Sequence, residues 1–243
     1  MYDSRLYNFL DFAKVLKIVQ MPTKKNSMRK LAIIVMVVGG IISIILQLTI
    51  PRVSSNTIIP NELKGILLPQ TKPLQPFKLT DHNIKPFGLA GFKDRWSFLF
   101  FGYTQCPDIC PTALGDLAAV FENLAQEHKV LANSQVVFIS IDPERDSPES
   151  LKEYVGYFNP GFIGVTGEAE ELQKFTRQLG ASYMLSPKKD EDGDYQVFHT
   201  SAVFLINPKG EFHALFQPSM SNPDHITQSY LKIRKLYLGD NPQ

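Results

Sequence analysis

The chain of 243 residues has little cysteine and almost no excess of charge of either sign. Its two cysteines allow at most one disulfide, which excludes a framework of structural disulfides. The formal net charge is +1 and the sequence after residue 51 has no basic stripe, so nucleic acid is not expected as a partner. A C-x-x-C-H motif is also absent, which excludes covalent attachment of a c-type haem.

The near-neutral total charge hides an asymmetry between the two ends of the chain. Residues 1–51 contain seven Lys or Arg and two Asp or Glu. Subtracting these from the totals of 25 basic and 24 acidic residues leaves 18 and 22, a net charge of −4 for the remainder. The first fifty residues are therefore basic, and the part that follows is mildly acidic.

An uncharged apolar run at residues 31–50 is long enough to cross a bilayer as a helix, which needs about 20 residues. Four basic residues precede this run between positions 24 and 30, and the first charge after it is Arg52. The positive-inside rule then places the N-terminus in the cytoplasm. We predict a cytoplasmic segment at 1–30 and a single transmembrane anchor at 31–50, in contact with the lipid bilayer.

A cleaved signal peptide is the competing interpretation of this run. Its apolar region would be shorter and would end in a small-x-small cleavage site, and neither feature is present. No cysteine directly follows the run, so a lipoprotein anchor is excluded. The N-terminus also lacks the Arg-rich, Ser-rich, acid-poor character of a mitochondrial transit peptide. We therefore expect a bacterial inner-membrane protein with a periplasmic C-terminal domain.

The remainder of the chain indicates one α/β domain after a linker. Residues 51–73 are rich in Pro, Ser, Asn and Thr and suggest a linker, which leaves 74–243 for the domain. Strands are predicted at 97–103 and 136–141, hairpins at 77–80 with 86–89 and at 202–206 with 211–216, and helices at 111–128, 147–158, 168–180 and 223–238. This order predicts a mixed sheet with flanking helices on both faces and an N-terminal hairpin, preceded by the transmembrane helix.

The two cysteines, Cys106 and Cys110, lie where a predicted strand ends and a predicted helix begins. Each precedes a proline, which disfavours the helical conformation and places Cys110 at the expected helix cap. The positive end of a helix favours thiolate and lowers the pKa of a cysteine. Two thiolates select a soft ion such as Cu(I), whereas a pair with no chemical role would simply be buried and inert.

His199 is the candidate third ligand for such a site. It follows an alternating stretch and precedes the predicted strand at 202–206. A neutral imidazole could complete a three-coordinate site with two sulfurs and one nitrogen. By itself, a histidine before a strand is more often a surface or hydrogen-bonded residue, so the local pattern alone does not assign it as a ligand.

Three ordered motifs resemble the Sco/SenC family of membrane-anchored copper-binding proteins. They are residues 100–112 (FFGYTQCPDICPT), 140–146 (SIDPERD), and 199–201 (HTS) followed by 205–210 (LINPKG). The resemblance covers about residues 74–240. Its departures are small: Asn207 stands where the family usually has Asp, and Phe198 and Thr200 vary the neighbours of the histidine.

The resemblance implies a thioredoxin-like fold and ligation of a copper ion by Cys106, Cys110 and His199. It also implies a role in loading the binuclear copper centre of cytochrome c oxidase, with the copper-bearing subunit of that enzyme as partner. It suggests that Asp142 tunes the site from nearby. As a structural alternative, Asp142 belongs to a turn before the next helix, and we leave it out of the ligand set.

A copper chaperone without enzymatic activity competes with a thiol–disulfide oxidoreductase that uses Cys106 and Cys110. A disulfide between these redox-active cysteines would remove both sulfur ligands, so a thiol–disulfide reductant is an expected partner. Dedicated thioredoxin-like reductases use C-x-x-C and a cis-proline facing it, and this chain has neither feature. Peroxiredoxins need Thr three residues before their cysteine, where Tyr103 stands here.

Overall fold

The structure, a computed structural model, describes residues 34–41, 43, 59–186, 195, 197–218 and 222–240. The chain divides into two compact units, Met1–Asn56 and Thr57–Gln243. In the first unit, residues 34–41 and 43 are helical. No helix within the described part of the chain is both long enough and apolar enough to cross a membrane.

The predicted N-terminal segments fall largely outside this description. All of the predicted cytoplasmic segment 1–30 lies outside the described residues, as does most of the predicted anchor 31–50. Both assignments therefore stay predictions from the sequence.

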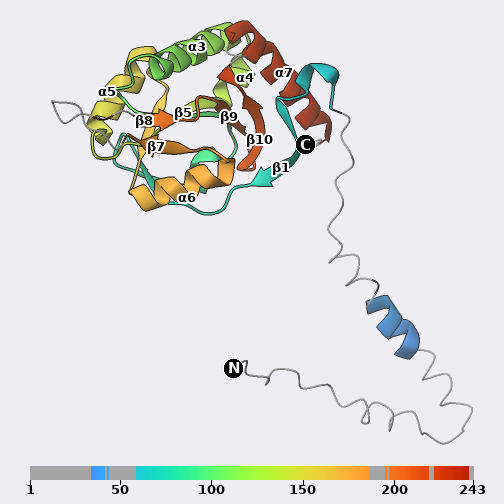
Figure 1. The fold of residues 1–243 in the computed structure, drawn as a ribbon. Coiled ribbons are helices and arrows are strands. Elements are labelled where there is room, and N and C mark those ends of the chain that lie inside the picture. The colour runs from blue at the N-terminus through green and yellow to red at the C-terminus, as the bar shows by residue number, and fades with distance from the viewer. Residues whose placement is uncertain are drawn as a thin grey trace, which may run out of the picture. The chain divides into compact units, whose positions relative to one another are not determined.

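The second unit is built around a mixed sheet, in which the described residues form eight strands (Figure 1). In order across the sheet, they are β1 (Leu67–Pro73), β10 (Glu211–Phe216), β9 (Val203–Ile206), β4 (Trp96–Gly102), β5 (Ser134–Ser140), β6 (Ile163–Thr166), β2 (Leu79–Asp81) and β3 (Pro86–Phe87). The three strands β4, β5 and β6 are parallel to one another, and the remaining pairs are antiparallel.

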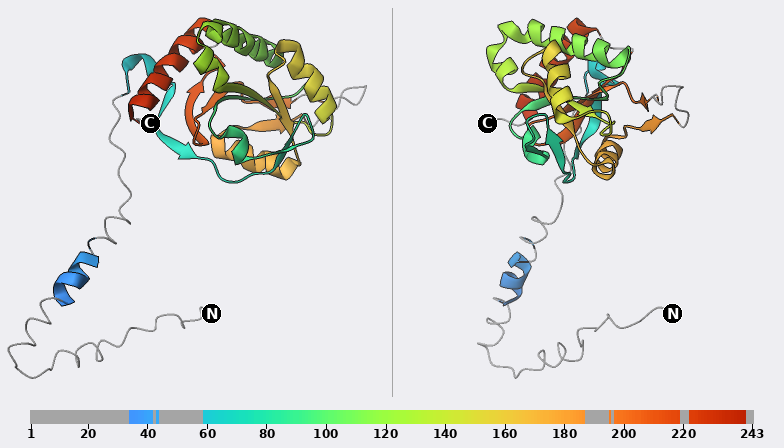
Figure 2. Two further views of the ribbon diagram at one scale, coloured as in Figure 1. Left: turned by 180° about the vertical axis from the view of Figure 1, so that it is seen from behind. Right: turned by 90° about the vertical axis from the view of Figure 1, so that its left-hand side faces the viewer.

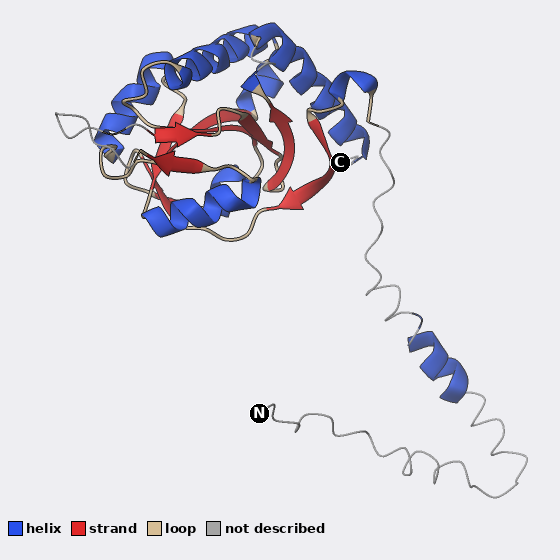
Figure 3. Cartoon of the chain, in the orientation of Figure 1, coloured by secondary structure: helices blue, strands red, loops and turns tan. Residues whose placement is uncertain are grey.

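Helices cover both faces of this sheet, as Figure 3 shows in blue against the red strands. They are α3 (Ile109–Asn123), α4 (His128–Ala132), α5 (Pro148–Phe158), α6 (Ala169–Leu179) and α7 (Pro223–Asp240), with short 3₁₀ turns η1 (Asn61–Leu63), η2 (Leu89–Phe92) and η3 (Leu124–Gln126). The helices α3, α5 and α7 lie along one face, and α6 lies along the other (Figures 1 and 2). The predicted mixed sheet with flanking helices is confirmed.

The two central strands, β4 and β5, carry apolar residues on both faces because both faces are covered. Every residue of both strands is buried, as the uninterrupted apolar runs predict. Polar positions inside these strands are paired: the Gln135 side chain donates to the Ser97 hydroxyl at 2.8 Å and to the Gly91 carbonyl at 2.7 Å. The centre of the sheet is therefore a rigid base for the segments that leave its ends.

Three of these strands end or begin at the same edge of the sheet. Gly102 at the end of β4 pairs with Ser140 at the end of β5, because the two strands are parallel and in register. The neighbouring β9 runs the other way, and its first residue Val203 pairs with Phe100. The loops after β4 and β5 and the segment before β9 consequently meet at one edge.

The segment before β9 forms a small hairpin that the sequence analysis did not predict. The strands β7 (Tyr183–Leu185) and β8 (Val197–His199) pair with each other, and His199 stands opposite Tyr183. Among the described residues they form a separate two-stranded sheet. Each strand has only three residues, the short end of the range for strands in globular proteins.

The structure corrects the predicted linker at its C-terminal end. Residues 67–73, assigned to the linker, form the edge strand β1 and pair with β10. Leu63 and Ile66 are buried in the domain core. Proline is tolerated in an edge strand, so a Pro-containing segment that resembles a loop can still pair. The domain therefore starts before residue 74.

The predicted ends of two helices agree with their observed capping. The Ser147 hydroxyl accepts a hydrogen bond from the Ser150 backbone N–H at 3.1 Å, and Pro148 is the first residue of α5. Gly180 ends α6 with a φ of 71°, a left-handed conformation that glycine adopts without strain. Short elements escaped prediction: α4 and β6 have five and four residues.

We predict that Leu63→Ala lowers the free energy of unfolding by about 2–5 kcal/mol, because it leaves a cavity in the core. The control is Leu238→Ala, the same change at a leucine of α7 that is 53% exposed, where about 0.5 kcal/mol or less is expected. Denaturant titration of both variants measures the difference. Equal, small effects would mean that the segment before residue 74 is a linker after all.

Candidate metal centre

The loop after β4 and the first turn of α3 carry the two cysteines. The structure places Cys106 in the loop and Cys110 as the second residue of α3. The predicted cap position of Cys110 is wrong by two residues, because the helix begins at Ile109 and its cap residue is Asp108. Pro111 is tolerated as the third helical residue, since the first backbone N–H groups of a helix have no partner within it.

The structure brings Cys106, Cys110 and His199 together from distant parts of the chain. One ligand atom from each of the three lies within 4.8 Å of the others. The Cys110 Sγ and His199 Nε2 are 3.5 Å apart, and both cysteines are free thiols. Three donors bound to one ion at about 2.0–2.3 Å lie roughly 3.5–4 Å apart in a trigonal arrangement, so only a small contraction is needed.

The His199 ring is held in the form that a metal requires. Its Nδ1 lies 3.2 Å from the Thr200 carbonyl oxygen, which can only accept a hydrogen bond. The proton of a neutral ring therefore sits on Nδ1, and Nε2 presents its lone pair toward the Cys110 sulfur. Burial lowers the pKa of His199 and favours this neutral form. The Phe100 and Tyr103 rings pack against the imidazole in T-shaped arrangements.

The two sulfurs occupy different environments. Cys110 is fully buried, whereas Cys106 is half-buried and accepts a hydrogen bond from the Cys110 backbone N–H at 3.4 Å. Burial raises the pKa of the Cys110 thiol well above its usual range. The expected lowering of the pKa by the helix N-terminus is wrong for Cys110, because desolvation outweighs the helix dipole there. A metal ion must therefore displace the Cys110 proton.

Gly102 provides the space into which the Cys110 sulfur packs. A Cβ atom at this position would lie 2.6 Å from Cys110 Sγ and 2.7 Å from Phe138 Cε2. Real contacts are not that short, so any larger residue would displace the sulfur or the ring. The sequence analysis did not identify Gly102 as a site residue, because its role depends on packing between β4 and α3.

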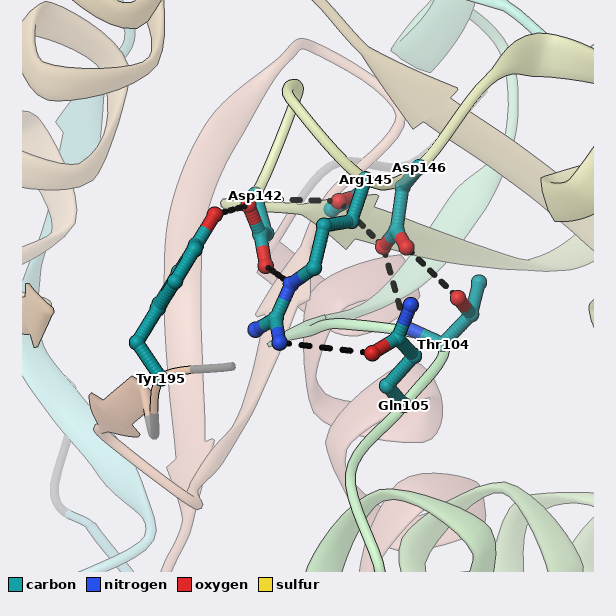
Figure 4. Close-up of polar contacts among 7 residues, drawn as sticks. Thr104, Gln105, Asp142, Arg145, Asp146 and Tyr195 are labelled. Carbon is teal, nitrogen blue, oxygen red and sulfur yellow. Dashed lines mark hydrogen bonds and ion pairs between the residues drawn. The ribbon is translucent and has the colours of Figure 1, made fainter. Parts of the chain in front are cut away.

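The turn between β5 and α5 lies beside the site and supports the loop that carries Cys106 (Figure 4). Asp142 and Asp146 are both buried in this turn. The Asp146 carboxylate accepts hydrogen bonds from the Thr104 backbone N–H at 2.9 Å, the Thr104 hydroxyl at 2.5 Å and the Ser140 hydroxyl at 2.6 Å. These bonds hold the residue two positions before Cys106.

Asp142 accepts from two side chains and is not among the three grouped ligands. Its carboxylate pairs with Arg145 and accepts a hydrogen bond from the Tyr195 hydroxyl at 2.6 Å. Burial, and then the bond to Asp142, raises the pKa of Tyr195 to about 12, so this hydroxyl stays protonated and donates. The placement agrees with leaving Asp142 out of the ligand set.

Sequence reasoning missed Tyr195, although a signal was present. Val197 and His199 lie two positions apart in β8, so their side chains point to one side, and Tyr195 lies two positions before the strand begins. Val197 is buried and Phe198 is 56% exposed, as this alternation requires. Counting back from the histidine in steps of two would have placed Tyr195 near the site.

Comparison with known proteins adds independent findings. The family model SCO1/SenC matches residues 68–235, more than half of the chain. A Stutzerimonas stutzeri protein, provisionally named a copper-binding protein, is 41% identical over 60% of this chain and 69% of its own length. The mouse mitochondrial protein SCO2 homolog is also 41% identical over 60% of this chain, but the match spans 56% of its length.

A solved structure resembles the domain as well. The crystal structure of Arabidopsis thaliana ScoI with copper bound aligns with a TM-score of 0.62 and 34% sequence identity. The alignment covers 67% of this chain and 98% of that one. The domain therefore shares its fold with a protein whose structure contains copper.

We expect Gly102→Ala to destabilise the fold by about 1–3 kcal/mol and to move the Cys110 sulfur out of the site, because the added methyl group has no space. Gly115→Ala in α3 is the control: a Cβ there meets no atom within 4 Å, and alanine favours a helix by up to about 1 kcal/mol. Denaturation of both variants and the labelling rate of Cys110 by a thiol reagent give the comparison. Similar behaviour of the two variants would show that the close contact at Gly102 is unimportant.

Proposed function

The chain belongs to the SCO1/SenC family, and from this premise we propose that it holds one copper ion between Cys106, Cys110 and His199 and delivers it to the copper-bearing subunit of cytochrome c oxidase. The observation that carries the proposal is the group of three donor atoms, which come from two distant segments of the chain and lie within 4.8 Å of one another. Two thiol sulfurs and one imidazole nitrogen form a donor set suited to copper.

The environment of the donors supports a soft ion of low charge. Two thiolates around Cu(I) carry a net charge of −1, and the Cys110 backbone N–H points at the Cys106 sulfur at the start of α3. Within the described part of the chain, the group contains no carboxylate, which a hard ion such as Mg²⁺ or Ca²⁺ prefers. The neutral His199 ring contributes nitrogen without added charge.

Delivery to cytochrome c oxidase rests on the resemblance of the three motifs to the family. A relative from Stutzerimonas stutzeri is named for copper binding, and a solved relative contains copper. The role in loading the binuclear copper centre is what the resemblance implies. The chain matches little more than half the length of the mouse SCO2 homolog, and the partner of this chain is part of the proposal.

A thiol–disulfide oxidoreductase is the second candidate, and the close approach of the two free thiols is the observation that favours it. A bond between their sulfurs would remove two copper ligands, so the same pair could make copper binding depend on the redox state. The imidazole beside Cys110 favours copper binding over the oxidoreductase, because thiol–disulfide exchange needs two sulfurs and no third donor.

We also propose that residues 31–50 anchor the chain in a bacterial inner membrane, with the domain in the periplasm. The uncharged length of this run and the basic residues before it support the proposal. Alkaline phosphatase, which is active only outside the cytoplasm, provides the test. A fusion after residue 56 should be active and a fusion after residue 30 inactive, and the reverse pattern would contradict this orientation.

The reduced full-length chain should bind about one copper ion with sulfur and nitrogen neighbours, as measured by X-ray absorption. His199→Ala should weaken copper retention by more than the roughly 10–100-fold that loss of an outer hydrogen-bond partner costs. His128→Ala, the same change at an exposed histidine, should leave retention unchanged.

Disulfide exchange by His199→Ala should stay close to that of the unchanged protein, because both thiols remain. If His199→Ala holds copper as tightly as the unchanged protein and the chain reduces disulfides with many turnovers, the oxidoreductase is the correct function.

A further inference from the structure

One short turn contacts both segments that carry the ligands. The turn joins β5 to α5 and spans Asp142–Asp146. Asp142 and Asp146 are each about 1% exposed, and each accepts hydrogen bonds from a different ligand-bearing segment. Buried carboxylates are costly unless they are paired, so these contacts are strongly favoured in the folded state.

On the cysteine side, the turn holds the loop before Cys106. Asp146 accepts two hydrogen bonds from Thr104, and the Arg145 guanidinium donates to the Gln105 side-chain oxygen at 3.3 Å. This loop also follows directly from β4, so the sheet and the turn fix it together. The position of Cys106 therefore has two independent supports.

On the histidine side, the turn contacts Tyr195, four residues before His199. The Tyr195 hydroxyl donates to Asp142, and the Arg145 guanidinium carbon lies 3.9 Å from the centre of the Tyr195 ring. Figure 4 shows the tyrosine reaching across to the turn, with Arg145 between it and Gln105. A hydrogen bond to a carboxylate and a cation–π contact thus act on one side chain.

The hairpin that bears His199 needs such a contact more than the cysteine loop does. Among the described residues, β7 and β8 pair only with each other, and an isolated two-stranded hairpin is marginally stable. The Thr200 backbone N–H donates to the Ser182 carbonyl at 3.0 Å, which closes the base of the hairpin, and the chain enters β9 three residues later. The position of the imidazole consequently depends on side chains on the inner face of β8.

We propose that Tyr195 is the positioning residue of the metal centre: its contacts with Asp142 and Arg145 hold the hairpin so that His199 faces the two cysteines. The inference rests on the proposed function, because it takes His199 as a copper ligand. Without the Tyr195 contacts, the sulfurs keep their places and the imidazole moves away. The ion is then left with two donors in place of three.

The test compares Tyr195→Phe with Tyr157→Phe in the full-length chain. The first change removes only the hydroxyl that bonds to Asp142, and the second removes the same atom from a tyrosine of α5 that is 86% exposed. Loss of Cu(I) to a chromogenic Cu(I) chelator should be roughly tenfold faster for Tyr195→Phe, which corresponds to about 1.4 kcal/mol. Tyr157→Phe should match the unchanged protein.

Two further measurements distinguish a role of Tyr195 in positioning His199 from a general loss of stability of the domain. In the copper-free chain, amide hydrogen exchange at Val197–His199 should be faster in Tyr195→Phe, while exchange in α3 stays the same. In the copper-loaded chain, X-ray absorption should show a weaker nitrogen contribution and an unchanged sulfur contribution. Arg145→Lys keeps the positive charge and loses the planar guanidinium over the Tyr195 ring. It should likewise speed hydrogen exchange at Val197–His199 and weaken the nitrogen contribution in X-ray absorption.

The outcomes separate the inference from the proposed function. If the unchanged protein binds no copper through sulfur and nitrogen, the proposed function fails, and hydrogen exchange still tests the role of Tyr195 in holding the hairpin. If the unchanged protein binds copper, but Tyr195→Phe equals Tyr157→Phe in copper loss and in exchange at Val197–His199, Tyr195 is not the positioning residue. Faster exchange throughout the domain would also overturn the inference, because it would indicate loss of global stability.

Discussion

The position of the metal centre depends on the direction of three neighbouring strands. The strand β4 pairs in parallel with β5 and antiparallel with β9. In-register pairing brings the ends of β4 and β5 to one edge of the sheet, and the reversed direction of β9 starts it at that same edge. The cysteine loop, the Asp142–Asp146 turn and the hairpin before β9 therefore share a small volume. The chemistry of the site is a consequence of strand direction at the centre of a fully buried sheet.

The site combines a buried, rigid half with a more exposed half. Cys110 packs beneath the sheet edge against Gly102, and burial keeps its thiol protonated in the free protein. Cys106 and His199 are only half-buried, and the histidine lies on a hairpin that is separate from the main sheet. An arrangement of this kind can hold an ion firmly from one side and still expose it on the other, which is compatible with the proposed delivery of the ion.

Much of the fold could be predicted because its signals are local. Uninterrupted apolar runs indicated β4 and β5, and Ser147-Pro148 indicated the start of α5. The candidate ligands could be named because three ordered motifs resemble a known family, whereas the cysteine pair alone is a weaker signal. The linker prediction extended too far because β1 is an edge strand in which proline is tolerated.

The remaining features depend on tertiary contacts that no local pattern contains. The helix begins at Ile109 although Pro111 follows, and desolvation of Cys110 outweighs the helix dipole that the sequence suggested. Gly102 matters because the Cys110 sulfur packs against it. The spacing from His199 hints that Tyr195 lies near the site, but its hydrogen bond to Asp142 is a tertiary contact. The short strands β7 and β8 are stabilised by pairing with each other, and their amino-acid composition does not predict them as strands.

The alternation of side chains along β8 places a strict limit on how the chain can change in evolution. Val197 and His199 share one face of β8, and Tyr195 lies two positions before the strand begins. One residue inserted or deleted between Tyr195 and His199 would change the spacing that lets the phenol reach Asp142 while the imidazole lies beside Cys110. Changes in length between the tyrosine and the histidine are therefore incompatible with this arrangement.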